Sequence, residues 1–145
     1  MTPLARAVQA QKAIAHPVRL RILCMLREGP LCGCQISAVV RLAQSTVSEH
    51  LSELRGAGLV AERKEGRWVE YRIETPDGAL ASILAELERD PAVRADRVLT
   101  RALRRVPLEE LCRADLDLAR LDRPSIAAAL ERAGRLRAAT KRGAA

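Results

Sequence analysis

Four cysteines carry the most distinctive chemistry in this chain of 145 residues. Cys32 and Cys34 are separated by one glycine, whereas Cys24 and Cys112 stand alone in the sequence. Thiolates are the preferred ligands of soft metal ions and the nucleophiles of redox chemistry. The paired cysteines therefore point to soft-metal binding or redox chemistry. An isolated cysteine more often packs as a small hydrophobic residue, which is the simplest interpretation of Cys112 taken alone.

The sequence shows neither a secretory signal nor a membrane helix. Residues 1–17 lack the continuous apolar stretch of a signal peptide, and no apolar run reaches the roughly 18 residues that a membrane helix needs. We therefore expect a cytoplasmic protein with no membrane partner, in a reducing compartment where disulfides do not form. Lys and Arg number 25 against 18 Asp and Glu, and the net charge of +7 predicts an anionic partner.

Helical spacing of apolar residues dominates the chain. It predicts four helices before Gly56, over residues 4–14, 18–27, 36–40 and 45–55. Residues 59–64 and 68–73 flank a glycine-containing turn and predict a β-hairpin, and Pro76-Asp77-Gly78 opens a fifth helix. Two short helices followed by a hairpin are typical of a winged helix, whose second helix enters the DNA major groove. The predicted fold is mainly α, a winged helix-turn-helix in the order α-α-α-α-β-β-α with a helical C-terminal extension.

Asp90-Pro91 predicts a boundary between two parts of the chain. Residues 1–90 form the expected winged helix-turn-helix domain for DNA binding and dimerisation. Residues 91–145 form the expected helical extension, which enlarges the dimer interface and ends in a disordered basic tail from Ala138.

Polar and basic side chains predict a DNA-binding surface on the fourth helix and the hairpin. Gln, Ser and Thr hydrogen-bond base edges or phosphates, and cations meet the phosphate backbone. The candidate residues are Gln44, Ser45, Thr46, Ser48 and His50 on the helix, and Arg41, Arg63, Lys64 and Arg67 around it. The alternative is a helix capped by Ser45 or Thr46 with a solvated face, on which His50 is an ordinary surface histidine.

Residues 15–73 resemble the ArsR/SmtB family of winged-helix metalloregulatory repressors. The resemblance lies in residues 16–23, 31–34, 44–51, 54–60 and 63–72. It implies a cytoplasmic homodimer, not an enzyme, that represses a promoter until an inducing ion binds. A two-fold dimer of this kind is expected to bind double-stranded operator DNA with inverted repeats. Ala43 stands where the family often has a capping serine, so Ser45 is expected to cap the helix instead.

The family's metal-binding patterns favour its arsenic and antimony branch. Residues 76–90 contain no histidine, which argues against the zinc site, and residues 1–23 contain no cysteine, which weakens the alternative of a cadmium or lead sensor. The arsenic branch has Leu-Cys-Val-Cys-Asp-Leu-Cys, and this chain has Leu-Cys-Gly-Cys-Gln-Ile-Ser at residues 31–37. Cys32 and Cys34 match, and Ser37 replaces the third ligand, for which Cys112 is the best candidate in the sequence.

These residues suggest a switch. Positions i and i+2 do not face each other on an α-helix, so Cys32 and Cys34 can bind one ion only from a loop or a distorted first turn. A helix N-terminus is expected to lower the pKa of both thiols. The hypothesis is that trivalent arsenic or antimony, as inducer, distorts the third helix and lowers DNA affinity. DNA binding itself requires no cofactor.

Two other interpretations use the same cysteines. Cys24 resembles the second-helix cysteine of the family's persulfide and redox sensors, which leaves a thiol-based redox-responsive repressor of the same fold as an alternative. A thiol oxidoreductase would show Cys-x-x-Cys beside a βαβ unit, and the sequence predicts no such unit. His16 and His50, the two histidines, have no plausible nucleophile and acid beside them.

Overall fold

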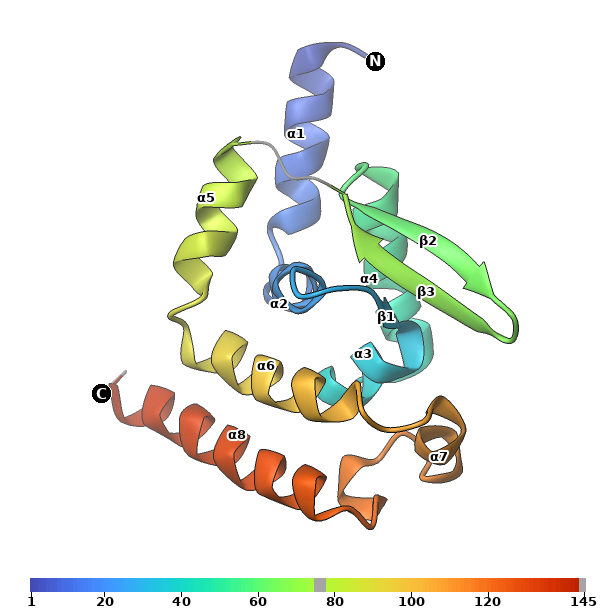
Figure 1. The fold of residues 1–145 in the computed structure, drawn as a ribbon. Helices are drawn as coiled ribbons and strands as arrows, with labels where there is room; N and C mark the ends of the chain where they lie inside the picture. The colour runs from blue at the N-terminus through green and yellow to red at the C-terminus, as the bar shows by residue number, and fades with distance from the viewer. Residues whose placement is uncertain (75–77, 144–145) are drawn as a thin grey trace.

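The computed structural model describes residues 1–74 and 78–143. Within these ranges the chain is mainly helical and carries one small antiparallel sheet (Figure 1). The helices are α1 (Pro3–Ile14), α2 (Pro17–Leu26), α3 (Gly33–Val40), α4 (Gln44–Gly56), α5 (Gly78–Leu87), α6 (Pro91–Leu103), α7 (Leu108–Arg113), a 3-10 turn η1 (Leu118–Arg120) and α8 (Pro124–Gly143). The strands are β1 (Leu31–Cys32), β2 (Val60–Glu65) and β3 (Trp68–Ile73). The mainly helical winged helix-turn-helix prediction is therefore confirmed.

The sheet contains a strand that the sequence analysis missed. Its strand order is β1-β3-β2, and β1 pairs antiparallel with β3 through Leu31 opposite Tyr71 and Cys32 opposite Glu70. A two-residue strand has no periodicity to detect, and its partner is distant in the sequence. The element order is thus α-α-β-α-α-β-β-α, and Cys32 stands in a strand.

Local signals set where several helices begin. The backbone N–H of Val18 donates to Nδ1 of His16, which caps α2 before Pro17. Asp90 caps α6 in the same way, since its carboxylate accepts from the N–H groups of Ala92 and Val93. The fifth helix was expected to open with Pro76-Asp77-Gly78. Pro76 and Asp77 lie outside the described residues, and α5 begins at Gly78.

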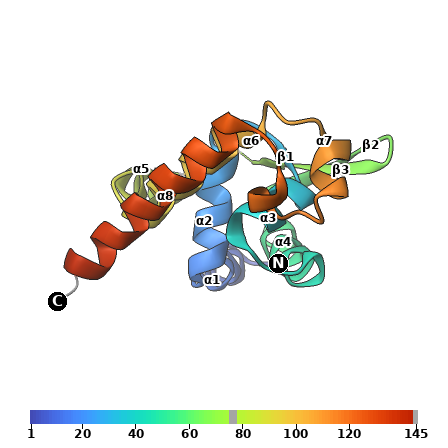
Figure 2. The same cartoon turned by 90° about the horizontal axis from the view of Figure 1, so that it is seen from below.

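One hydrophobic core spans both sides of Asp90. Ile22 of α2, Leu103 of α6 and Ile126 of α8 are almost fully buried in the same cluster. Helix α6 packs against α2 and α3 on one side and along α8 on the other, as Figures 1 and 2 show from two directions. The C-terminal helices therefore complete the core of the same chain, and α8 is helical as far as Gly143, beyond the expected start of the tail at Ala138.

A buried ion-pair cluster joins α2, α6 and α8. Asp96 of α6 is 1% exposed and accepts from Nε and Nη2 of Arg21 at 2.7 and 2.8 Å. Arg137 of α8 reaches the same carboxylate at 3.3 Å.

None of the described helices is long and apolar enough to cross a bilayer.

Candidate DNA-binding surface and thiol cavity

Helix α4 separates its apolar side from its polar side. Val47, Leu51 and Leu54 are buried against the body of the protein, whereas Gln44 and Ser48 are exposed. Ser45 is also exposed, and Thr46 is partly buried. This arrangement leaves the first turn of α4 available to a partner with its N–H groups and short polar side chains.

The expected capping of α4 by Ser45 or Thr46 is wrong. The helix starts at Gln44, its N-cap is Ala43, and no side chain caps it. Ser45 and Thr46 stand inside the first turn, beyond the single position from which a side chain can cap the helix.

His50 faces inward instead of joining the exposed polar residues. Its ring lies 4.4 Å from that of His16, centroid to centroid, and its Nδ1 accepts from Nε of Arg19 at 3.2 Å. Burial lowers the pKa of His50, and the neighbouring charges of His16 and Arg19 lower it further. The structure therefore places His50 as a contact between α4 and the start of α2.

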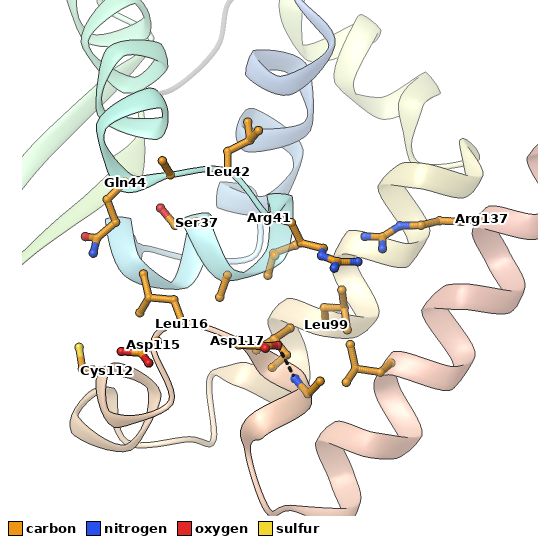
Figure 3. A pocket seen from close by; sticks show the side chains of 16 residues that line it. Ser37, Arg41, Leu42, Gln44, Leu99, Cys112, Asp115, Leu116, Asp117 and Arg137 are labelled. Carbon is orange, nitrogen blue, oxygen red and sulfur yellow. Dashed lines mark hydrogen bonds between the residues drawn. The ribbon is translucent and has the colours of Figure 1, made fainter.

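The basic candidates separate into two groups. Arg63, Lys64 and Arg67 are exposed on the β2–β3 hairpin, where Arg67 lies over the Trp68 ring at 5.5 Å. Arg63 pairs with Glu65 at 2.7 Å in an exposed contact. Arg41 ends α3, and Figure 3 shows its side chain on the side of α8, pointing toward that of Arg137.

Three of the four cysteines line one cavity of about 480 Å³. Cys32 is the N-cap of α3 in extended backbone, and Cys34 follows within the helix, so the pair spans a strand-to-helix junction. Cys112 reaches the cavity from α7. The remaining walls come from the start of α4 and from the wing: Gln44, Ser45, Val47, Ser48, Leu51, Arg67, Trp68, Val69 and Tyr71, with Gly33 between the paired cysteines.

The expected low pKa of the paired thiols is wrong. Burial raises the pKa of Cys34 to about 11, although backbone N–H groups of Cys34 and Gln35 act in the opposite direction. Burial also raises the pKa of Cys32, and Glu70 adds to the effect. Removal of the sulfur atoms from water outweighs the helix N-terminus, so both thiols carry their protons at neutral pH.

The three thiols line the same cavity but are not arranged as the ligands of one metal ion. In residues 1–74 and 78–143, no three His, Cys, Asp or Glu side chains are grouped closely enough to hold a metal ion. Cys32 and Cys34 are 7% and 6% exposed, whereas Cys112 is exposed on the six-residue helix α7. Ser37 stands where the family pattern has its third cysteine, but it is buried and lines a neighbouring cavity. It therefore offers no third ligand in the cavity of Cys32, Cys34 and Cys112.

Cys24 is separated from this group by its burial. It is 1% exposed in α2, and burial raises its pKa to about 11, with a smaller contribution from Glu88. It is absent from the lining of the cysteine cavity. These properties fit a packing residue.

Sequence reasoning missed the connection between α7 and the wing. Glu109 of α7 accepts from Nη2 of Arg67 at 3.4 Å, one helical turn before Cys112. Nothing in the sequence near either residue marks this contact, because it depends on how residues 104–108 return the chain to α3.

The fold and this surface define a winged helix-turn-helix regulator of the DNA-binding class. Residues 16–62 match the model of the family described as "Bacterial regulatory protein, arsR family". The chain is 33% identical over 109 residues to the "Arsenical resistance operon repressor" of Escherichia coli, an alignment that covers 74% of this chain and 90% of that protein. This chain therefore belongs to the arsR family of bacterial transcriptional regulators, which are not enzymes.

Other similar proteins carry different names. The "Arsenic resistance transcriptional regulator ArsR1" of Pseudomonas putida is 41% identical over 63 residues, which is 43% of this chain and about half (49%) of that protein. The structure of HlyU from Vibrio cholerae is 38% identical, with a TM-score of 0.53 over 61% of this chain and 96% of that one. A homodimeric winged helix-turn-helix DNA-binding domain from Mycobacterium bovis is 31% identical. Its TM-score is 0.52 over 59% of this chain and 82% of that one.

Proposed function

We propose that this regulator represses transcription from an operator and releases the DNA when trivalent arsenic or antimony binds Cys32, Cys34 and Cys112. The observation that carries the proposal is that these three thiols line one cavity whose other walls are the start of α4 and the wing. Two similar proteins named for arsenic resistance support the choice of ligand.

Protonated thiols suit arsenous acid. Each cysteine sulfur that bonds to arsenic displaces one hydroxyl, and this hydroxyl leaves as water with the thiol proton. Three cysteines thus consume one arsenous acid and release three waters, with no net release of protons and no change of oxidation state. A divalent cation such as Cd²⁺ instead requires thiolates, whose formation the burial of Cys32 and Cys34 opposes.

Ligand binding in this cavity has a direct route to the DNA-binding surface. Cys112 must approach the buried pair, because the three thiols are not grouped as a ligand set in the described residues. Movement of α7 would carry Glu109, which contacts Arg67 of the wing. It would also change the wall that Gln44 and Ser48 form at the start of α4. A coupling of about 1–3 kcal/mol per site changes DNA affinity roughly 5–150-fold.

The protein is proposed to act as a homodimer on inverted repeats. Leu4, Val8 and Ile83 are exposed on α1 and α5, where an apolar groove separates the two helices. Exposed apolar surface of this kind favours contact with a second copy. Two copies related by a two-fold axis place their α4 helices on equivalent half-sites of the operator.

A mobility-shift assay on the DNA upstream of the protein's own coding sequence tests this function. Arsenite and antimonite should release the DNA, and cadmium and zinc should not do so at equal concentration. Cys32→Ser and Cys34→Ser should retain DNA binding and lose the response. Operator affinity that arsenite leaves unchanged in the wild type would contradict the proposal.

Arg67→Gln and Glu109→Gln separate DNA contact from signal transmission. The first should weaken DNA binding, because it removes a wing cation. The second should leave DNA affinity close to that of the wild type and reduce the change that arsenite causes. Glu131→Gln, which alters an exposed acidic residue of α8, is the matched control.

A further inference from the structure

A second cavity, of about 670 Å³, lies between the α3–α4 turn and the C-terminal helices. Figure 3 shows its lining, to which α6, α7 and α8 contribute. Its apolar part includes Leu99, Leu116, Leu118 and Leu130. This volume is in the range of cavities that hold small organic molecules.

The charged side chains that line this cavity differ in their partners. Asp115 accepts from Nη1 of Arg120 at 2.6 Å, and Asp117 accepts from the N–H of Ala119 at 3.0 Å. Arg41, in contrast, has no ion pair or side-chain hydrogen bond among residues 1–74 and 78–143. Arg137 has only the 3.3 Å contact to Asp96, whose carboxylate Arg21 already binds at two points. The lining thus carries two arginines and two aspartates, and the two arginines are the ones without a strong ion pair among the described residues.

The two arginines lie at one end of the cavity. Figure 3 shows the guanidinium groups of Arg41 and Arg137 pointing toward each other, whereas Asp115 lies beside Cys112 away from Arg137. Arg41 is exposed and Arg137 is partly buried, so solvent weakens the repulsion between them. An anion between the two guanidinium groups would accept hydrogen bonds from both.

An unpartnered hydroxyl also lines the cavity. Ser37 is 3% exposed, and its Oγ has no hydrogen-bond partner in the part of the chain that the structure describes. A buried hydroxyl without a partner costs free energy, and native proteins retain few of them. In Figure 3 this hydroxyl points toward Gln44 and the start of α4, away from the guanidinium groups of Arg41 and Arg137.

We propose that this cavity binds a small organic carboxylate with an apolar body. Arg41 and Arg137 hold the carboxylate, and the leucines enclose the hydrocarbon part. Arg41 ends α3 in left-handed backbone, with φ of 60°, and Leu42 and Ala43 then lead into α4. Occupancy therefore changes the contacts of the turn that sets α4 on α3, and this cavity shares Gln44 and Cys112 with the cysteine cavity.

Hexanoate tests the proposal, with hexanol and inorganic phosphate as matched probes. The full-length protein is titrated under reducing conditions without arsenite, and backbone amide shifts are followed by two-dimensional NMR. Hexanoate at millimolar concentration should cause saturable shifts at Leu116, Ala119 and Arg137, and both other probes should bind far more weakly. No saturable shift with hexanoate, or equal binding of hexanol or phosphate, would overturn the proposal.

Variants test the assigned residues. Arg41→Gln should weaken hexanoate binding at least about tenfold, since it removes a charge-assisted hydrogen bond. Arg105→Gln, an exposed arginine outside the lining, should have no effect. Ser37→Ala, which removes a lining hydroxyl that does not face the two arginines, should bind hexanoate as the wild type does. Wild-type affinity in Arg41→Gln would refute the assignment.

Discussion

Cys34, buried at the start of α3, and Cys112, exposed on α7, line the same cavity although they are far apart in the sequence. Burial is the main cause of the raised pKa of Cys34, and the electrostatic interaction with Cys112 raises this pKa further. The relationship places an exposed thiol beside a buried pair, and the proposed response to arsenic depends on their coming together.

The first prediction concerns Cys112. Cys112→Ser should leave operator affinity unchanged, because its side chain is not among the residues expected to contact DNA. The arsenite concentration that releases DNA should rise at least about tenfold, since one of three As–S bonds is lost. Thiol titration together with a mobility shift measures both effects. Cys24→Ala is the control and should respond as the wild type does; a wild-type response in Cys112→Ser would remove Cys112 from the site.

The second prediction concerns pH. The raised pKa values of Cys32 and Cys34 mean that Cd²⁺ must displace thiol protons, so its apparent affinity should rise by up to about tenfold per pH unit for each thiol. Arsenite binding releases water and no net proton, so its affinity should be nearly constant between about pH 6 and 8. Competition titrations at several pH values compare the two slopes. A cadmium affinity that does not change with pH, together with an arsenite affinity that falls as the pH rises, would show that the resting thiols are already ionised.

The third prediction concerns Asp96. Asp96→Asn should lower the free energy of unfolding by about 3 kcal/mol, because it leaves Arg21 beside α6 without its charged partner. Urea unfolding followed by circular dichroism measures the change. Glu131→Gln breaks an exposed pair with Arg135 and should cost less than about 0.5 kcal/mol. Similar losses in the two variants would mean that the buried pair does not stabilise the contact of α2 with α6.

The fourth prediction concerns His50. In the unfolded chain this residue takes up a proton as the pH falls below its ordinary pKa of 6.5, whereas the folded protein resists protonation to a lower pH. The free energy of unfolding should therefore be constant above that pH and fall as the pH decreases through it. His50→Asn retains an acceptor for Arg19 and should flatten the decrease. An unchanged pH profile would mean that another group controls it.

The elements that depend on neighbouring residues were predictable from the sequence. The apolar spacing of Val47, Leu51 and Leu54 located α4, and alternation around Gly66 located the wing, since both patterns are local. Cys32 and Cys34 were recognisable as a pair for the same reason. The family resemblance then associated this pair with a regulator that binds DNA.

The tertiary structure decided what depends on distant contacts. Pairing with β3 made Cys32 part of a strand, and packing against α2 and α3 made α6 part of the core. Burial raised the pKa of Cys34, although a helix N-terminus alone would lower it. Contacts with His16 and Arg19 turned His50 inward, and the return of α7 toward α3 placed Cys112 in the cavity. Spacing along the chain shows which residues share a local element, whereas desolvation and long-range packing determine which of them meet and in what charge state.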